Sequence, residues 1–401
     1  MTDTIAVVGT GVAGATAAQT LRTEGFTGRV VLIGHESALP YRRPVLSKEL
    51  LAGTTTRERS LLQPENFWGD NNIELHTGTT VTALDGAGHR LTLSSGEKLD
   101  YDAVLLATGG QARQLNYPNA GSRVFTLRNI DDVVPLRAAL DHGGSLLVIG
   151  AGLIGCEVAA TASQMGLDVT VLEAAPVPLS RIVPAEIAQM YMQLHSDNGV
   201  EIVTGVKLAA LVEVRGEVRA IATDGSTWRA DAALVAVGST PNTALAEAAG
   251  LHVDNGIIVD ERYHTSVSGV YAAGDVANSP NPVLGGRQRS EHWNDARAQG
   301  EAAAKSILGQ SVQTPDAPWG WSTQYGNNLQ FAGWTRHDDD YLVAGDITTR
   351  NFTALALRDR RLVGAIAMGR PKDIRTVRTM IHSNAIIDAD NAAQALAGVA
   401  G

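Results

Sequence analysis

Two stretches of this chain repeat one pattern of apolar, glycine-rich and alanine-rich segments. The first copy is IAVVGTGVAGATAAQTLRTEGFTGRVVLIGHE (residues 5–36), and the second is LLVIGAGLIGCEVAATASQMGLDVTVLE (residues 146–173). In each copy a short apolar run precedes a glycine-rich turn, an alanine-rich segment of helical length and a second apolar run. Strands that are buried on both faces of a parallel sheet have such continuous apolar runs. The repeat therefore predicts two βαβ units of the kind that bind nucleotides.

The similarity between the two copies continues into predicted hairpins. Residues 90–92 and 99–100 flank the turn SSGE, and residues 218–223 and 227–230 flank the turn DGS. Short polar turns between strand-like runs are typical of β-hairpins. Each copy then closes with one more apolar run, YDAVLLATGG or ADAALVAVGS. The repeating unit is therefore a βαβ unit with an added hairpin, present twice.

The first glycine-rich turn has the spacing that binds the pyrophosphate of a dinucleotide. Gly9 permits a tight turn, Gly11 lets a pyrophosphate approach the backbone, and Gly14 lets helix and strand pack closely. The helix that follows offers free N–H groups and the positive end of its dipole to the phosphates. Glu36 lies 22 residues beyond Gly14, where an acid can bind ribose hydroxyls.

The second glycine-rich turn has the same spacing. It contains Gly150, Gly152 and Gly155, and Glu173 follows 18 residues after the last of them. One such turn is a weak indication of a dinucleotide site, but two in a full strand–turn–helix–strand context are a strong one. A carboxylate at Glu173 accepts hydrogen bonds from a 2′-hydroxyl and repels a 2′-phosphate. Arg181 is the nearest arginine that could hold a phosphate, so the sequence favours NADH over NADPH.

The end of the chain has a different pattern from the two repeats. From Gln313 the run QTPDAPWGW is proline-rich and predicts a linker. After it come two short strand-like segments, FTALALRD and RLVGAIAMG, and a helical stretch over residues 373–382. These elements predict a small α+β domain at the C-terminus.

Several short motifs lie outside the two glycine-rich turns. They are LPYRRPVLSK (residues 39–48), ATG (107–109), GD (274–275), EHWNDARAQG (291–300) and WGWSTQYG (319–326). Together with the turns, they resemble the FAD-dependent, NADH-dependent ferredoxin reductases of bacterial oxygenases, of the putidaredoxin reductase and biphenyl dioxygenase reductase type. The resemblance covers essentially the whole chain. In the first motif Val45 replaces the second proline of the family's PYxRPPLSK.

The resemblance implies roles for three charged side chains. In the family, the arginine at the position of Arg43 contacts the adenine half of FAD, and the lysine at the position of Lys48 lies beside the flavin. Glu157 matches the family acid that pairs with this lysine near the nicotinamide. A buried lysine needs a counter-charge. We therefore expect Lys48 and Glu157 to be the catalytic pair.

The same resemblance implies two sets of cofactor-binding residues. Asp275 would hold the ribityl chain of FAD, Trp293 would lie against its isoalloxazine, and Trp321 and Gln324 fall on positions near the flavin. The FAD set is Gly9, Gly11, Gly14, Glu36, Arg43, Lys48, Val81, Ala107, Thr108, Gly109, Arg128, Asp275, Glu291, His292, Trp293 and Trp321. The NAD set is Gly150, Gly152, Ile154, Gly155, Glu157, Glu173, Arg181 and Gly238.

The implied fold class is α/β, with two Rossmann-like dinucleotide-binding domains in a glutathione-reductase-like arrangement and a small α+β C-terminal domain. Residues 1–112 and 241–313 would form a discontinuous FAD-binding domain. Residues 113–240 would bind NAD, and residues 314–401 would form the C-terminal domain. Thr323 and Gly326 replace two family aspartates, which puts in question whether the family's partner contacts are kept.

The chain has one cysteine, Cys156, which excludes an intramolecular disulfide and a dithiol redox centre. It follows the second glycine-rich turn, where it either packs as a small residue or has a pKa lowered by the helix N-terminus. Residues 42–51 lack the flavin-side cysteine of peroxide and NADH-oxidase relatives. A flavin accepts a hydride and can release single electrons. Without a thiol relay, we expect electrons to leave the flavin edge for an external acceptor.

Charge and composition narrow the partners. The net charge of −10 argues against a nucleic-acid binder, but eight Lys or Arg and three acids lie between residues 345 and 382. Such a basic face could steer an acidic ferredoxin. The N-terminus has no basic signal-peptide region, and no apolar run reaches the roughly 18 residues that span a membrane. We expect a cytoplasmic monomer or homodimer, and the histidine spacing predicts no metal site.

Three functions remain open at this point. The main hypothesis is an NADH:ferredoxin oxidoreductase that passes electrons through FAD, one at a time, to a [2Fe–2S] ferredoxin. That ferredoxin would feed a cytochrome P450 or a ring-hydroxylating oxygenase. The second is a rubredoxin reductase or an NADH oxidase. The third is an NADH-sensing flavoprotein of the apoptosis-inducing-factor type.

Overall fold

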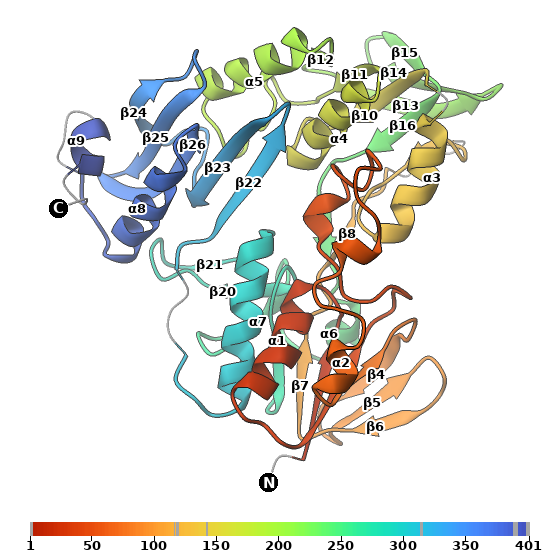
Figure 1. The fold of residues 1–401 in the computed structure, drawn as a ribbon, viewed down its shortest axis with the longest axis vertical. Helices are drawn as coiled ribbons and strands as arrows, with labels where there is room; N and C mark the ends of the chain where they lie inside the picture. Colours follow the sequence, from red (N-terminus) through yellow and green to blue (C-terminus); the bar gives the residue numbers. More distant parts are fainter. Residues whose placement is uncertain are drawn as a thin grey trace. The chain divides into compact units, whose positions relative to one another are not determined.

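The structure, a computed structural model, describes residues 3–387 and 392–397, apart from residues 116, 118, 119, 142 and 313–315. The chain forms two compact units (Figure 1). Unit 1 consists of Met1–Arg43, Arg57–Gln111 and Thr240–Pro318, and unit 2 consists of Pro44–Thr56, Ala112–Ser239 and Trp319–Gly401. The segment Pro44–Thr56 therefore packs with unit 2, although the sequence on both sides of it belongs to unit 1.

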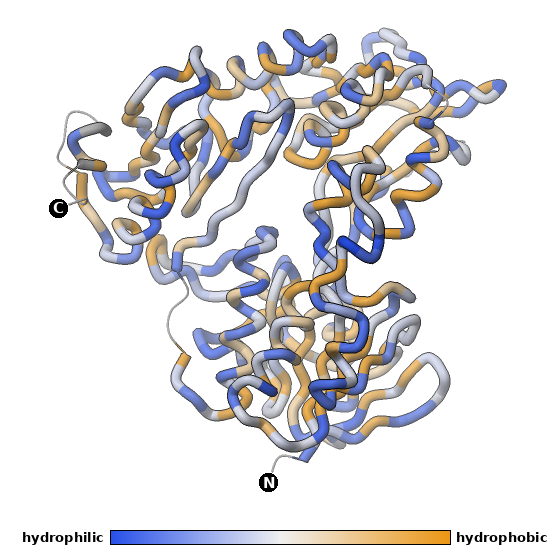
Figure 2. The backbone as a smooth tube through the Cα atoms, in the orientation of Figure 1, coloured by the Kyte–Doolittle hydropathy of each residue, from blue (hydrophilic) through white to orange (hydrophobic). Residues whose placement is uncertain are grey.

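Five strands form the central sheet of unit 1: β1 (Thr4–Val8), β2 (Arg29–Ile33), β3 (Ile73–His76), β7 (Ala103–Leu106) and β19 (Val270–Ala272). Their order is β19-β7-β1-β2-β3, and every pairing is parallel. Strands β1 and β7 are apolar (Figure 2). Their residues are almost wholly buried, as both faces of a parallel sheet require. These strands place the carboxyl end of β1, and the glycine-rich turn after it, at one edge of the sheet.

Helices α1 (Val12–Thr23) and α7 (Trp293–Ile307) lie side by side in unit 1 (Figure 1). Their close approach depends on small residues, because a Cβ on Gly300 would lie 2.2 Å from the carbonyl oxygen of Ala13. Shorter elements complete the unit. They are η2 (Glu58–Ser60), α2 (Phe67–Asp70), α6 (Ala244–Ala248), β18 (Ile257–Ile258), β20 (Ala277–Pro280) and β21 (Arg287–Gln288). The 3-10 turn η1 (Arg43–Val45) lies where the chain passes into unit 2.

Unit 2 repeats this plan with its own five-stranded parallel sheet. The strands are β9 (Val124–Phe125), β10 (Ser145–Ile149), β11 (Asp168–Leu172), β12 (Glu201–Val203) and β16 (Ala232–Val235). Their order is β12-β11-β10-β16-β9, with β10 at the centre as β1 is in unit 1. The helices of this part are α3 (Ile130–Leu140), α4 (Leu153–Gln164) and α5 (Ala185–Asp197).

Each predicted hairpin belongs to a three-stranded antiparallel sheet. In unit 1 the strands are β4 (Val81–Asp85), β5 (Arg90–Leu93) and β6 (Lys98–Asp100). In unit 2 they are β13 (Leu208–Val214), β14 (Glu217–Ala222) and β15 (Thr227–Ala230). Both hairpins are confirmed. The sequence pattern missed the first strand of each sheet, and also the short strands β8 (Gly110–Ala112) and β17 (Ser239–Pro241).

The C-terminal part of unit 2 is an antiparallel sheet with helices. Its strands are β22 (Trp319–Gln324), β23 (Asn327–Gly333), β24 (Asp340–Asp346), β25 (Asn351–Arg358) and β26 (Arg361–Met368), in the order β22-β23-β26-β25-β24. Its helices are α8 (Pro371–His382) and α9 (Ala392–Ala397). The predicted linker was wrong over WGW, which forms the start of β22, while residues 313–315 lie outside the described residues.

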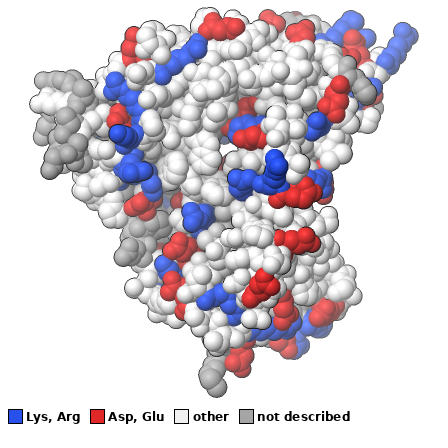
Figure 3. Space-filling model, viewed as in Figure 1, with Lys and Arg blue, Asp and Glu red and all other residues white. Residues whose placement is uncertain are grey.

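The expected fold class is confirmed, with two parallel α/β parts and an α+β C-terminal part. Lys, Arg, Asp and Glu side chains are interspersed over the face drawn in Figure 3. Within the described ranges, no helix is long and apolar enough to cross a membrane.

Candidate functional site

The two glycine-rich turns have the same local geometry. Gly9 donates its N–H to the carbonyl oxygen of Ile33 at 2.7 Å, and Gly150 donates to that of Leu172 at 2.8 Å. Each turn thereby joins the end of the first strand of its βαβ unit to the end of the second. Gly9 and Gly150 have φ values of 118° and 105°, in a region that residues with a Cβ rarely adopt.

The space around these glycines fits a bound pyrophosphate. A Cβ on Gly14 would lie 1.9 Å from the oxygen of Gly9, and one on Gly155 would lie 2.0 Å from that of Gly150. The close approach of the backbone at these two places thus requires a glycine at the last position of each turn. A Cβ on Gly11 or on Gly152 would meet nothing within 4 Å. The middle glycines therefore face open space at the N-termini of α1 and α4, where a phosphate has room to bind.

Glu36, the acid of the first βαβ unit, is buried and held by two side chains. Its Oε2 accepts a hydrogen bond from the Tyr41 hydroxyl at 2.6 Å, and its Oε1 lies 2.5 Å from Nη2 of Arg43. The Arg43 guanidinium also lies over the Tyr41 ring, 5.2 Å from its centre. Burial opposes the charge of Arg43, yet the oxygens of Tyr41 and Glu36 outweigh burial and raise its pKa. Glu36 and Arg43 are thus fixed to each other shortly after β2, whose last residue, Ile33, accepts the hydrogen bond from Gly9.

Other predicted FAD residues of unit 1 lie in turns that polar contacts hold. Thr108 donates its hydroxyl to the carbonyl oxygen of Asn242 at 2.8 Å, and Gly109 accepts from the Asn242 N–H at 2.9 Å. Next to Asp275, Gly274 donates its N–H to Oε1 of Gln299 at 2.9 Å. At the start of α7, Nδ2 of Asn294 is buried without a hydrogen-bond partner in the described part of the chain. Such an orphaned donor fits a site that a polar cofactor completes.

Glu173, the acid of the second βαβ unit, is held by backbone groups. Its Oε2 accepts from the N–H of Ala151 at 2.6 Å, and its Oε1 accepts from the N–H of Ala175 at 2.8 Å. The carboxylate therefore lies against the second glycine-rich turn. Arg181, the arginine nearest in sequence, is exposed. The local charge beside this turn is thus that of a carboxylate, which suits a ribose hydroxyl better than a phosphate.

Lys48 and Glu157 form a mostly buried ion pair inside unit 2. Nζ of Lys48 lies 2.6 Å from Oε2 of Glu157, and the two side chains are 16% and 4% exposed. Ser47 also donates its hydroxyl to the same carboxylate oxygen. The carbonyl oxygen of Ser47 accepts from the Thr161 hydroxyl at 2.8 Å, which ties the segment Pro44–Thr56 to α4.

Ser322 of β22 supplies a contact that the sequence analysis did not include. Its hydroxyl donates to Oε1 of Glu157 at 2.8 Å, so both carboxylate oxygens have donors. Ser47 and Ser322 each lie inside a family motif, next to the predicted residues Lys48 and Trp321. Their position beside these predicted residues is the sequence feature that could have identified both serines. The predicted residue Gln324 is 2% exposed and donates to Ser322 at 3.0 Å.

The remaining predicted residues occupy several environments. Val81 is a core residue of β4, and Ile154 is 46% exposed in the first turn of α4. Cys156 is buried, and burial raises the pKa of its thiol, so the helix N-terminus does not make it a reactive thiolate. Of the FAD set, unit 2 contains Lys48, Arg128 and Trp321, and unit 1 contains Gly9, Gly11, Gly14, Glu36, Arg43, Val81, Ala107, Thr108, Gly109, Asp275, Glu291, His292 and Trp293. Unit 2 contains the whole NAD set, including Gly238.

This fold and these paired turns define a class of flavoprotein oxidoreductase. Residues 3–300 match the pyridine nucleotide-disulphide oxidoreductase family, and residues 319–398 match the reductase C-terminal family. The chain belongs to the pyridine nucleotide-disulphide oxidoreductase family, whose members bind FAD and NAD(H). The family resemblance of the sequence motifs is thereby confirmed.

Individual relatives match the chain from end to end. It is 36% identical over 396 residues to the ferredoxin–NAD(+) reductase subunit of the benzene 1,2-dioxygenase system of Pseudomonas putida, covering 98% of this chain and 96% of that one. It is 36% identical to the ferredoxin reductase component of chlorobenzene dioxygenase from Cupriavidus sp. (strain PS12), covering 97% and 94%.

Solved structures match equally well. Putidaredoxin reductase, in its covalent complex with putidaredoxin, has a TM-score of 0.94 at 31% identity and covers 99% of this chain and 98% of its own. The ferredoxin reductase for the CYP199A2 system from Rhodopseudomonas palustris has a TM-score of 0.94 at 33% identity and covers 100% of both chains.

Proposed function

We propose that this protein is an NADH:ferredoxin oxidoreductase that supplies electrons to an oxygenase through a [2Fe–2S] ferredoxin. The observation that carries the proposal is the 36% identity over 98% of the chain to the reductase subunit of a dioxygenase system. A ring-hydroxylating oxygenase and a cytochrome P450 are the two terminal enzymes that the relatives' names suggest.

The chain's own residues divide the binding work between two regions. Residues 1–112 and 241–313 would bind FAD, with the open face of Gly11 for the pyrophosphate and Glu36 beside it. Residues 113–240 would bind NADH, with Gly152 for the pyrophosphate and Glu173 for the ribose. Residues 314–401 would form the C-terminal domain. FAD, when bound, accepts two electrons as a hydride and releases them singly.

Lys48 and Glu157 would serve the nicotinamide end of the reaction. The carboxylate of Glu157 holds the ammonium of Lys48 at one oriented position, and the pair is largely shielded from water. An ammonium in such a place can interact with a carbonyl oxygen of either cofactor ring. Its counter-ion offsets part of the cost of burying the charge.

The exit of electrons would not involve a thiol. Cys156 is the only cysteine in the sequence, and burial raises the pKa of its thiol. A dithiol relay of the kind found in disulfide reductases is therefore excluded. This favours direct transfer to an external acceptor over the disulfide and peroxide reactions of other family members.

The basic C-terminal region would receive the acceptor. Helix α8 exposes Lys372 and Arg375, and Figure 3 shows Lys and Arg side chains over the C-terminal part of the molecule. Arg378, on the same helix, lies 5.6 Å from the centre of the Trp319 ring. An acidic ferredoxin would be attracted to such a surface. The cytoplasmic location and the choice between monomer and homodimer stay predictions.

One stopped-flow experiment tests the proposed function. The FAD-loaded protein is first reduced with NADH, and its flavin absorbance is followed. A panel of [2Fe–2S] ferredoxins, a rubredoxin and oxygen is then offered to the reduced protein. We expect rapid reduction of at least one ferredoxin and slow reaction with oxygen. Failure with every iron–sulfur acceptor, or preference for the rubredoxin, contradicts the proposal.

A further inference from the structure

A chain of hydrogen bonds extends from Glu157 into the interior of unit 2. Ser322 donates to Glu157 at 2.8 Å, and Gln324 donates through Nε2 to Ser322 at 3.0 Å. Oε1 of Gln324 lies 2.8 Å from Nε2 of His195, and the Tyr325 hydroxyl lies 3.2 Å from Nδ1 of His195. The chain thus links α4, α5 and the β22–β23 hairpin.

All the inner members of this chain are buried. Ser322 and His195 are 0% exposed, Gln324 is 2% exposed and Glu157 is 4% exposed. A buried polar group without a partner is costly, so each of these groups must satisfy its neighbour. The arrangement of protons is therefore constrained along the whole chain.

Because of this constraint, all the hydrogen bonds in the series are donated in one direction. A carboxylate only accepts hydrogen bonds, so Ser322 must donate its proton to Glu157. The oxygen of Ser322 is then left to accept, which orients the Gln324 amide with its NH2 group toward Ser322 and its oxygen toward His195. His195 must therefore donate an N–H from Nε2 to this oxygen. Its Nδ1 is then left to accept from the Tyr325 hydroxyl. Every proton thus points toward Glu157.

The ionisable groups around Glu157 are consistent with this direction. Burial lowers the pKa of His195 to about 4, so the ring is neutral near pH 7 and has one N–H to give. Burial also raises the pKa values of Cys156 and Tyr191, so both are neutral. Lys48 is the cation that faces the carboxylate, at 2.6 Å.

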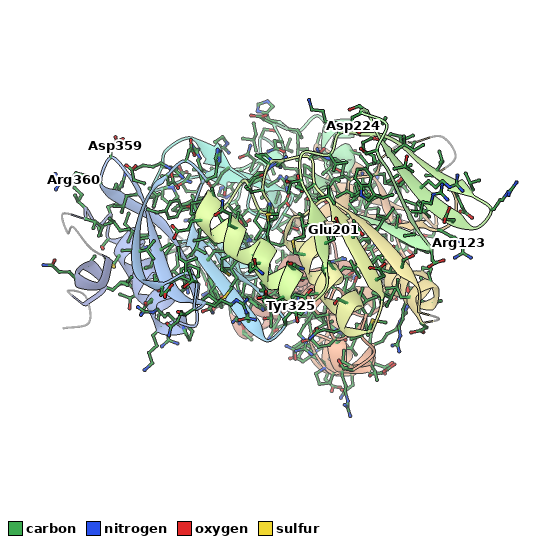
Figure 4. The ribbon with its side chains drawn as sticks, turned by 90° about the horizontal axis from the view of Figure 1, so that it is seen from above. Arg123, Glu201, Asp224, Tyr325, Asp359 and Arg360 are labelled. Atoms are coloured by element: carbon green, nitrogen blue, oxygen red, sulfur yellow. The ribbon has the colours of Figure 1, made fainter. Side chains whose placement is uncertain are left out.

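The hydrogen-bond chain ends, on the side away from Glu157, in a strained turn. Tyr325 has a φ of 49°, in the left-handed region that is rare for a large side chain, and Gly326 follows with a φ of 75°. The Tyr325 and His195 rings meet edge to face at 5.3 Å, and Tyr325 lies beside α5 in Figure 4. This conformation aims the hydroxyl at Nδ1 and keeps the hairpin against α5.

We propose that Ser322, Gln324 and His195 are positioning residues for the Lys48–Glu157 pair. By holding Oε1 of Glu157, they turn Oε2 toward Lys48 and Ser47 and keep the carboxylate in one orientation. The C-terminal region thus completes the pair that the proposed function places at the nicotinamide, and the kinetic part of this inference rests on that function.

The first test measures the hydride-transfer step. Ser322→Ala should lower the rate constant for flavin reduction by NADH about tenfold, equal to about 1.4 kcal/mol, with little change in the dissociation constant for NAD+. Ser322→Thr keeps the hydroxyl and should restore most of the rate.

Ser306→Ala is the matched control for this change. Ser306 is also a buried serine, at 3% exposure, but its hydroxyl has no hydrogen-bond partner in the described part of the chain. Its removal should leave the rate constant unchanged. If Ser322→Ala and Ser306→Ala have the same rate constant, or if Ser322→Thr restores none of the lost rate, Ser322 does not position the pair.

The second test needs neither cofactor turnover nor a partner. In Glu157→Gln, Lys48 can only donate, so it must hold the oxygen of the new amide, and the new NH2 group then faces Ser322. Ser322 now accepts from this NH2 group, and its own proton needs a new acceptor. We expect the Gln324 amide to turn its oxygen toward that proton, which reverses each later bond. The proton of His195 should therefore move from Nε2 to Nδ1, which 15N NMR of the histidine ring reports. An unchanged Nε2–H tautomer would overturn the directional chain.

The two tests separate this inference from the proposed function. If the wild-type protein is not reduced by NADH, the proposed function fails, while the tautomer result still decides whether the chain is directional. Suppose instead that NADH reduces the wild-type protein normally, but Ser322→Ala leaves the rate constant unchanged and Glu157→Gln leaves the tautomer unchanged. Then the positioning role is contradicted, and the proposed function is not.

Discussion

The Nζ atom of Lys48 lies 2.6 Å from Oε2 of Glu157, although 109 residues separate the two in sequence. The ammonium and the carboxylate are both largely out of contact with water, with side-chain exposures of 16% and 4%. Removing one partner would leave the other charge buried without compensation. The pair therefore links stability to the proposed chemistry.

Lys48→Met should lower the free energy of unfolding by about 3 kcal/mol, because Glu157 is left as an uncompensated buried charge. Urea denaturation measures this loss. The double variant Lys48→Met, Glu157→Gln should recover much of it, since no buried charge remains. Equal losses in the single and double variants would show that charge burial is not the cause.

The middle and the last glycine of the first turn should respond differently to alanine. Gly14→Ala places a Cβ 1.9 Å from a backbone oxygen, and we expect a loss of about 3 kcal/mol in unfolding free energy. Gly11→Ala meets nothing within 4 Å, so the apoprotein should keep its stability. It should instead weaken FAD binding, measured by fluorescence titration. A Gly11→Ala protein with normal FAD affinity would argue against a pyrophosphate at this turn.

Glu173→Gln should shift the cofactor preference toward NADPH. Two like charges ~4 Å apart repel by about 1 kcal/mol in water and more near a protein surface. The ratio of kcat/KM for NADPH to that for NADH should therefore rise by at least about fivefold. Steady-state kinetics with both cofactors measure it. Glu201→Gln, at an exposed position that Figure 4 labels, is the control and should leave the ratio unchanged.

Charge reversal should separate structural from surface arginines in the C-terminal region. Arg358 bonds the carbonyl oxygen of Trp334 and pairs with Asp339, whose side chain is 2% exposed. Arg358→Glu should therefore cost about 3 kcal/mol of stability. Arg375 is exposed, and Arg375→Glu should raise the KM for ferredoxin about threefold at low salt without changing stability. Identical ferredoxin kinetics at low salt would remove α8 as the docking surface.

The buried His195 should make stability depend on pH. Its pKa falls from 6.5 to about 4 in the folded protein, because burial disfavours the charged ring. The unfolded chain therefore takes up a proton below pH 6.5, while the folded protein stays neutral until about pH 4. Stability should be lost as the pH falls through this window, by about 3 kcal/mol in total. His195→Gln should flatten this part of the curve of unfolding free energy against pH.

Local patterns predicted the parts of the molecule whose structure depends on near neighbours. The two glycine-rich turns and both hairpins follow from spacing, since glycine sterics and short polar turns act over a few residues. Parallel strands such as β1 and β7 were also predicted, because each is a continuous run of apolar residues, which is again a local pattern. The first strands of the two antiparallel sheets were missed, because β4 and β13 have weak alternation and their pairing depends on strands already in place.

The C-terminal arginines show that a count of charged residues does not predict the role of each one. The eight basic residues between 345 and 382 predict a docking face as one group. In the folded protein Arg358 holds Asp339, Arg350 holds Asp197, and Arg361 bonds Asn384. Their roles depend on the residues that the antiparallel strands bring beside them, which no local pattern contains.

The sequence by itself determined that this chain has two dinucleotide-binding βαβ units, an acid after each, and no thiol relay. These conclusions rest on residue identity and on spacing along one backbone segment. Only the tertiary structure decided how the buried carboxylate of Glu157 is satisfied. Its donors come from Ser47, Lys48 and Ser322, in segments far apart along the chain. A charge buried away from water needs donors on all its free sides, and only folding can bring them from such distances.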